Sequence, residues 1–188
     1  MNILTDTLPE ELLICGKNYP IKTDFKIWIK FSQIIFSGEM DHKKLAKALR
    51  LLFDKLPPKL DKALNAVMEF YNPPKKQSKS RQKKNNKRAY DFEYDAEFIY
   101  AAFLQQYKID LNKADLHWWQ FKSLFDCLTD ETNFIKIVGY RSINLKDIKD
   151  KEQKKFYREM KELYKLPDNR TEEEKEADFR SGFLDAFI

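Results

Sequence analysis

No stretch limits the possible folds of this chain more than residues 75–88, KKQSKSRQKKNNKR, because they contain no apolar side chain. Such a segment has nothing to bury that would offset the entropy lost on ordering it. Any core must therefore be built from the residues before and after it. We expect an N-terminal part over residues 1–72, a flexible basic linker or loop over 73–90, and a C-terminal helical region over 91–188 that packs with the N-terminal half.

The same segment also determines the charge of the chain. It holds eight of the 35 lysines and arginines and no acid, which leaves 27 basic against 30 acidic residues elsewhere, a net charge of −3. One interpretation is a nucleic-acid-binding module in which these cations neutralise phosphates. The cations are Lys75, Lys76, Lys79, Arg81, Lys83, Lys84, Lys87 and Arg88. The segment has no aromatic residue for base stacking, so a solvated linker is the simpler interpretation.

Outside that segment, apolar residues recur with the spacing of amphipathic helices. Only 4 glycines among 188 residues and a charged fraction of 35% also favour helices over a turn-rich β architecture. The residues around Gly16, over 11–21, are typical of a short β-hairpin. We therefore predict a mainly α, bundle-like fold with a small N-terminal hairpin. The predicted helices cover residues 24–37, 42–56, 60–71, 95–107, 115–128, 132–143, 147–165 and 171–188.

Capping residues and apolar stripes define the helices further. Thr23 is expected to cap the first helix, Asp41 the second, and Asp115 the helix that begins near the HWW motif. In the charged helix over 147–165, one narrow stripe is expected to dock on the rest of the protein. This stripe consists of Phe156, Met160, Leu163 and Tyr164.

The motif HWW at residues 117–119 joins one of the two histidines to two of the three tryptophans. On a helix, the side chain of His117 would lie on the same side as the apolar residues, which predicts a buried or half-buried core group with one hydrogen-bond partner. Catalysis would need an orienting acid and a nucleophile or metal, and the sequence offers no such constellation. It also contains no glycine-rich phosphate loop and no zinc-ligand spacing. We therefore expect neither an enzyme nor a cofactor or metal site.

Two apolar features are expected either to pack against this chain itself or to bind a partner. Trp119 projects from the polar face of its helix, so another element of the same chain covers it or it anchors a partner. The C-terminal helix is amphipathic and has no C-cap, so it closes the core of this protein or docks on another subunit or partner. The candidate partner-binding residues are therefore Trp119, Phe179, Phe183, Leu184, Phe187 and Ile188.

Three aromatic motifs carry a resemblance to a known family. They read DFEYDAEFIYAAFLQQYKIDL, LHWWQFKSLFDCL and FIKIVGYRSINL, and they follow an N-terminal stretch that reads LPEELLICGKNYPIKTDFKIWIKF. In order and spacing they resemble the bacteriophage gene-product-fifteen family. The resemblance covers most of the chain, except the basic segment and the C-terminal end.

The resemblance implies a phage or prophage protein that acts as a tail-assembly chaperone or virion morphogenesis factor, and not as an enzyme. The expected partner is the tape-measure protein; a second tail-assembly chaperone and a homo-oligomer are left open. No binding or catalytic residue is implied. A tape-measure protein is a very long helix with exposed apolar stripes, so a chaperone for it needs apolar grooves or amphipathic helices.

The sequence also indicates where the protein works. No apolar run approaches the roughly 20 residues of a membrane span, and the N-terminus MNILTDTLPEE lacks a signal-peptide pattern. We therefore expect the cytoplasm of the bacterial host cell and no membrane partner. Cys15 and Cys127 are expected to be small apolar filler.

Overall fold

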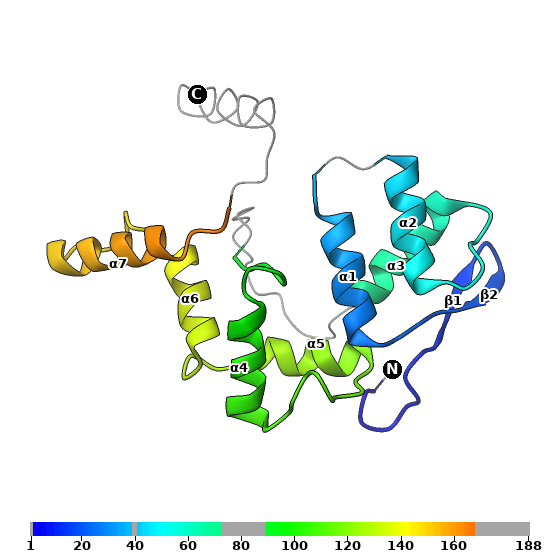
Figure 1. The fold of residues 1–188 in the computed structure, drawn as a ribbon, viewed down its shortest axis with the longest axis horizontal. Helices are drawn as coiled ribbons and strands as arrows, with labels where there is room; N and C mark the ends of the chain where they lie inside the picture. The colour runs from blue at the N-terminus through cyan, green and yellow to red at the C-terminus, as the bar shows by residue number, and fades with distance from the viewer. Residues whose placement is uncertain (1, 39–40, 73–88, 168–188) are drawn as a thin grey trace.

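Seven helices and a two-stranded hairpin make up the part of the chain that the computed structural model describes, residues 2–38, 41–72 and 89–167 (Figure 1). In chain order they are β1 (Glu11–Ile14), β2 (Lys17–Pro20), α1 (Phe25–Ile35), α2 (His42–Leu52), α3 (Leu60–Tyr71), α4 (Ala96–Tyr107), α5 (Trp118–Asp126), α6 (Asn133–Ser142) and α7 (Lys151–Leu163). The predicted mainly α fold with an N-terminal hairpin is confirmed. The basic segment 75–88 and the predicted C-terminal helix lie outside the described residues. None of the described helices is long and apolar enough to cross a membrane.

The hairpin forms as the sequence predicts. β1 and β2 pair antiparallel, with Leu12 opposite Tyr19. The turn residues Cys15 and Gly16 both have positive φ angles, 51° and 79°. A two-residue turn of this kind matches the twist of the strands, and glycine adopts a positive φ without steric cost. Cys15 is exposed in this turn and Cys127 is exposed after α5, so the expectation that both cysteines fill apolar space is wrong.

Helices α1, α2 and α3 form the N-terminal half, and α2 lies against α1 on the side away from α4 (Figure 1). Asp41 caps α2 as predicted, because its Oδ1 accepts a hydrogen bond from the backbone N of Lys44 at 2.6 Å. α2 begins where the apolar spacing predicts a helix, and its apolar residues at that spacing are buried: Leu45, Ala48, Leu49 and Leu52.

The first residues of α1 and α5 lie side by side, and this corrects two predicted caps. Asp24, not Thr23, caps α1, and His117, not Asp115, caps α5. The Thr23 carbonyl instead accepts a hydrogen bond from the Trp118 backbone N at 2.7 Å. The residues before the two helices are thus held extended against each other in a short antiparallel bridge between Asp24 and His117. Tertiary pairing, which capping propensity ignores, selects these helix starts.

A stack of aromatic rings joins the parts of the chain on either side of residues 73–88. The rings of Trp28 and Trp118 stack at 5.9 Å between centroids, and those of Phe25 and Phe121 at 4.8 Å. Phe103 of α4 also stacks on Phe121, at 5.2 Å. Each ring buries a large apolar area, so these contacts carry much of the core.

A buried ion pair holds the C-terminal half together. Asp95, directly before α4, is 0% exposed, and the guanidinium of Arg141 in α6 binds both of its carboxylate oxygens, at 2.7 and 2.8 Å. The same guanidinium donates to the backbone carbonyls of Ala89 and Tyr164. Arg141, in α6, therefore ties together three other segments: the residues around Ala89, the N-cap of α4 at Asp95 and the end of α7 at Tyr164.

Helix α7 lies at one end of the molecule beside α6 (Figure 1) and buries none of its residues. The predicted docking stripe is partly wrong, because Leu163 is 67% exposed. The contact to α6 runs through Phe156 and Tyr164 of the predicted stripe and also through Tyr157. Each of these three rings lies 6.1 Å from the ring of Tyr140. Apolar spacing alone does not show which side of an edge helix has a neighbour.

Candidate functional site

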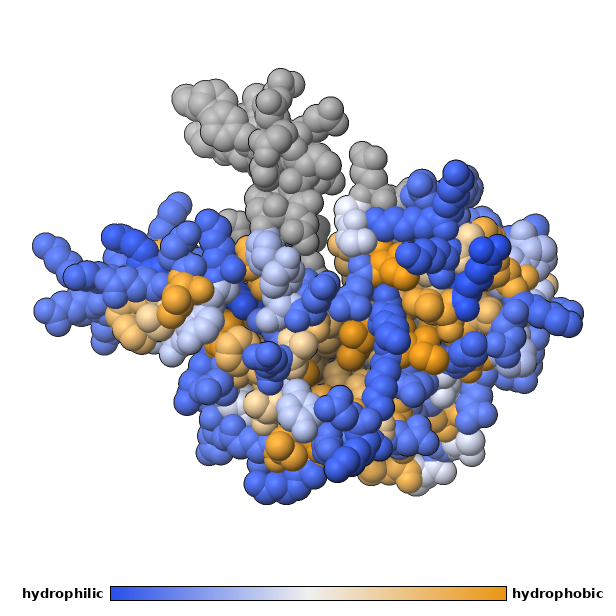
Figure 2. Space-filling view, viewed as in Figure 1, coloured by the Kyte–Doolittle hydropathy of each residue, from blue (hydrophilic) through white to orange (hydrophobic). Residues whose placement is uncertain are grey.

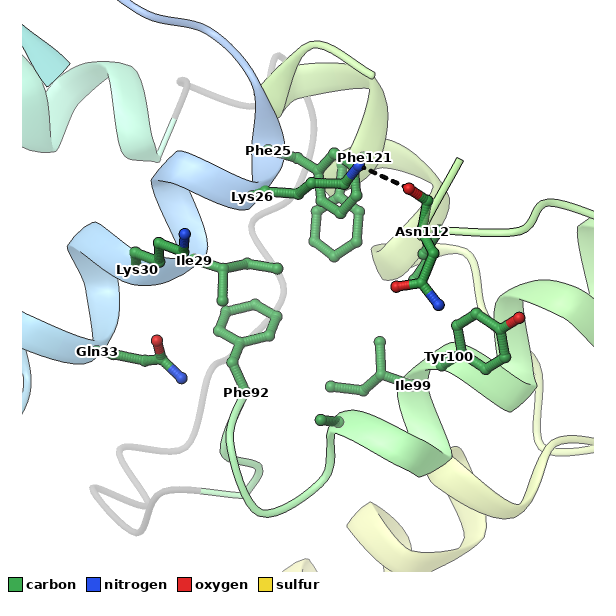
Figure 3. Close-up of a pocket in the computed structure, with 12 residues that line it drawn as sticks. Phe25, Lys26, Ile29, Lys30, Gln33, Phe92, Ile99, Tyr100, Asn112 and Phe121 are labelled. Carbon is green, nitrogen blue, oxygen red and sulfur yellow. Dashed lines mark hydrogen bonds between the residues drawn. The ribbon is translucent and has the colours of Figure 1, made fainter. Parts of the chain in front are cut away.

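An apolar groove opens between α1 and α4, with α5 below it. Figure 2 shows it as a hollow lined by hydrophobic residues and bordered by hydrophilic ones on the α1 side. Its volume is about 320 Å³, which is at the small end of the range for ligand pockets. The lining residues, shown in Figure 3, are Phe25, Lys26, Ile29, Lys30, Gln33, Phe92, Ala96, Ile99, Tyr100, Leu111, Asn112 and Phe121.

Aromatic rings form the floor of the groove. Phe25 and Phe121 are buried and stack with an interplanar angle of 15°. Phe103 packs on Phe121, with the two rings nearly parallel at 4°. Because three helices supply these rings, the floor is fixed before any ligand arrives, and less free energy is lost on ordering it.

The α4 wall depends on a turn just before that helix. The Asp91 carboxylate accepts hydrogen bonds from the backbone N of Glu93 and of Tyr94, at 2.6 and 3.0 Å. This turn places the ring of Phe92 against the groove, 6.2 Å from the ring of Phe121. The Asp95–Arg141 ion pair fixes the end of the same turn, so it also positions Phe92.

The mouth of the groove carries its polar groups. Lys26 Nζ donates to the backbone carbonyl of Asn112 at 3.1 Å, which links α1 to the loop after α4 (Figure 3). On the α4 wall, the Tyr100 hydroxyl donates to Asp110 at 3.3 Å. The hydrogen bond from the backbone N of Asn112 is the main reason that the pKa of Asp110 lies below its usual value, so this carboxylate stays charged.

His117 lies outside the groove and acts as a structural group. Its Nδ1 accepts a hydrogen bond from the backbone N of Trp119 at 3.0 Å, which caps α5. Its Nε2 lies 3.1 Å from the carbonyl oxygen of Pro9, and since a carbonyl can only accept, Nε2 carries the hydrogen. His117 is half-buried as predicted, but it has two ring partners instead of one and lies before the helix, not on its face.

Lowering the pH should destabilise the protein through His117. Burial holds the pKa of His117 below its ordinary value of 6.5, although the Pro9 carbonyl and the charge of Glu10 act in the opposite direction. The neutral ring therefore stabilises the fold above pH 6.5, and this contribution is lost as the pH falls through the folded-state pKa. Because His117 binds one proton, it can lower the free energy of unfolding by at most about 1.4 kcal/mol per pH unit.

The measurement is the free energy of unfolding in urea at a series of pH values for the wild type and two variants. His117→Asn keeps a cap acceptor but cannot titrate, so its free energy of unfolding should change less between pH 7.5 and 5 than that of the wild type. The difference between the two slopes should correspond to about one proton or less. His42→Asn, at an exposed position on α2, should behave as the wild type does. Equal pH profiles for the wild type and His117→Asn would contradict this role.

Trp119 is partly covered by its own chain. Its ring packs on Phe70 at 5.0 Å between centroids, and its Nε1 donates to the Phe70 carbonyl at 2.8 Å. This agrees with the expectation that Trp119 packs against its own chain, while a role as a partner anchor stays a prediction. The other predicted partner-binding residues, Phe179, Phe183, Leu184, Phe187 and Ile188, and the eight cations of 75–88 lie outside the described residues.

The sequence did not single out the groove residues. Its usable signal was the wide apolar arc of α1, in which Trp28 and Phe31 face the core while Ile29 lines the groove. An arc wider than one packing face indicates a second apolar contact. Within residues 2–38, 41–72 and 89–167, no group of three or more His, Cys, Asp or Glu side chains could hold a metal ion.

Helical proteins commonly use an open apolar groove of this kind to hold an apolar segment of another chain. The family described as Bacteriophage Gp15 protein matches residues 4–166, a range that includes every residue of the groove. The chain belongs to this family and is a phage protein, so the resemblance seen in the aromatic motifs is confirmed. Comparison with curated proteins and with solved structures gave no match.

Proposed function

We propose that this protein is a non-catalytic tail-assembly chaperone that binds and shields a tape-measure protein in the cytoplasm of the bacterial host. The apolar groove between α1 and α4 is the observation that carries the proposal. A tape-measure protein is a long helix whose apolar stripes aggregate until the tail tube encloses them. Reversible cover for such a stripe requires an apolar groove that recognises side chains at helical spacing.

The dimensions of the groove suit anchor residues more than a whole helix. A volume of about 320 Å³ admits a few large side chains. Two or three apolar residues from successive turns would enter it, and the rest of the helix would stay outside. Such partial contact favours affinities that are weak enough for release, because only a few anchors contribute most of the binding free energy.

Co-expression with the long helical protein encoded beside this one tests the proposal. We expect the tagged protein to co-purify with that partner and to raise the partner's soluble fraction. Ile29→Glu places a carboxylate among the groove's apolar side chains and should weaken binding at least about tenfold, or 1.4 kcal/mol. Leu13→Glu is the matched control, because Leu13 is exposed on β1 and does not line the groove.

Two results would contradict the proposal. Absence of the partner from the purified wild type, with no gain in its solubility, would rule out a chaperone of this partner. Equal recovery of the partner with Ile29→Glu and with Leu13→Glu would show that another surface binds it. A thermal melt of each variant shows whether it remains folded.

A further inference from the structure

The charged groups that line the groove all have the same sign. Among the residues that the structure describes, two charged residues line it, Lys26 and Lys30, both on α1. They are four residues apart, so they project from adjacent turns along one edge of the groove. The remaining polar lining groups are the neutral side chains of Gln33, Tyr100 and Asn112.

Neither lysine forms an ion pair within the described residues. Lys26 donates to a neutral acceptor, the Asn112 carbonyl, and its ammonium group lies 5.5 Å from the centre of the Phe25 ring. Lys30 is exposed beside the groove. In the same part of the chain, five other cations do pair with carboxylates: Lys22, Lys113, Lys122, Arg141 and Lys165. The positive charge at this edge is therefore available to a ligand.

Nearby carboxylates do not cancel this charge at the groove itself. Asp110 accepts from the Tyr100 hydroxyl and from the Asn112 backbone N, and it pairs with Lys113 at 3.5 Å. Glu93 and Glu97 are exposed on the opposite wall, next to Phe92 and Ala96 in sequence, but they do not line the groove. A ligand in the groove would thus meet lysines on its α1 side.

We propose that the groove selects amphipathic helices whose apolar stripe is bordered by carboxylates, with the carboxylates facing Lys26 and Lys30. This inference rests on the proposed function and specifies which segments of a helical partner are bound. Apolar anchors enter over the Phe25 and Phe121 floor, while glutamates or aspartates one turn apart on the border reach the two ammonium groups. A stripe bordered by lysines would bring like charges together and bind more weakly.

Two synthetic helical peptides of equal length test the inference against the full-length protein. Both carry the same leucine and phenylalanine stripe, and one has glutamates while the other has lysines at the bordering positions. We expect the glutamate peptide to bind about tenfold more tightly at low salt, as two pairs of exposed charges allow. The difference should shrink as added salt shortens the screening length.

A charge-reversal pair provides the matched control. Lys26→Glu with Lys30→Glu should reverse the preference between the peptides. Lys43→Glu with Lys47→Glu makes the same change in net charge at two exposed positions four residues apart on α2, and it should leave the preference largely unchanged. An equal effect of both double variants would mean that only net charge matters, and the inference would be wrong.

Other outcomes also decide the matter. Equal affinity for the two peptides, or no binding of either, would overturn the inference. So would a dimer of the protein alone that Ile29→Glu converts to monomer, because a second copy would then hold the groove. Co-purification of the tape-measure protein without any charge preference leaves the proposed function standing. A clear preference without co-purification leaves the charge inference standing and removes the proposed function.

Discussion

Replacing Arg141 with methionine is expected to lower the free energy of unfolding by about 3–5 kcal/mol. Methionine approximates the length of the arginine stem but leaves the fully buried Asp95 carboxylate without its cation. The carbonyls of Ala89 and Tyr164 lose their donor in the same change. Urea denaturation followed by far-UV circular dichroism measures the effect.

Two companion variants separate the ion pair from a general effect of removing arginine. Arg158→Met, at an exposed position on α7, should change the stability by less than about 0.5 kcal/mol. Arg141→Met combined with Asp95→Asn should recover part of the loss, because it removes the uncompensated charge. Similar costs for Arg141→Met and Arg158→Met would show that the ion pair does not hold α4, α6 and α7 together.

Trp118→Ala is expected to cost about 3–5 kcal/mol, as truncation of a large buried side chain usually does. Trp118 is fully buried, stacks on Trp28, Tyr71 and Phe121, and donates from Nε1 to the Tyr71 carbonyl at 3.0 Å. The neighbouring Trp119 is only partly buried, so Trp119→Ala should cost clearly less. The same denaturation experiment compares the two, and the opposite order would contradict the assignment of Trp118 to the core.

The prediction of helices succeeded where burial follows local spacing. The apolar face of α2 and the cap at Asp41 depend on residues within a few turns of each other, and both are confirmed. The caps of α1 and α5 were mispredicted because those helices start against each other, and Thr23 uses its backbone to bind Trp118. Pairing between residues that are distant in sequence is invisible to a local pattern.

The Asp95–Arg141 ion pair is likewise a contact between residues distant in sequence, which a local pattern does not predict. Arg141 looks like an ordinary surface residue near the end of a helix, and its partner lies 46 residues earlier. The groove was missed for a related reason, since its walls come from α1, α4 and the turn at Phe92. The family, in contrast, could be predicted because its aromatic motifs are contiguous in the sequence.

Site-specific photo-crosslinking measures most directly whether the groove holds the tape-measure protein. A photoreactive phenylalanine analogue at Gln33, which lines the groove, is compared with the same analogue at Arg50, which is exposed on α2 and does not line it. In cells that co-express the adjacent long helical protein, we predict a crosslink to that protein from position 33 and none from position 50. A crosslink from position 50 but not from 33, in a pair that still co-purifies, would contradict the groove as the binding site.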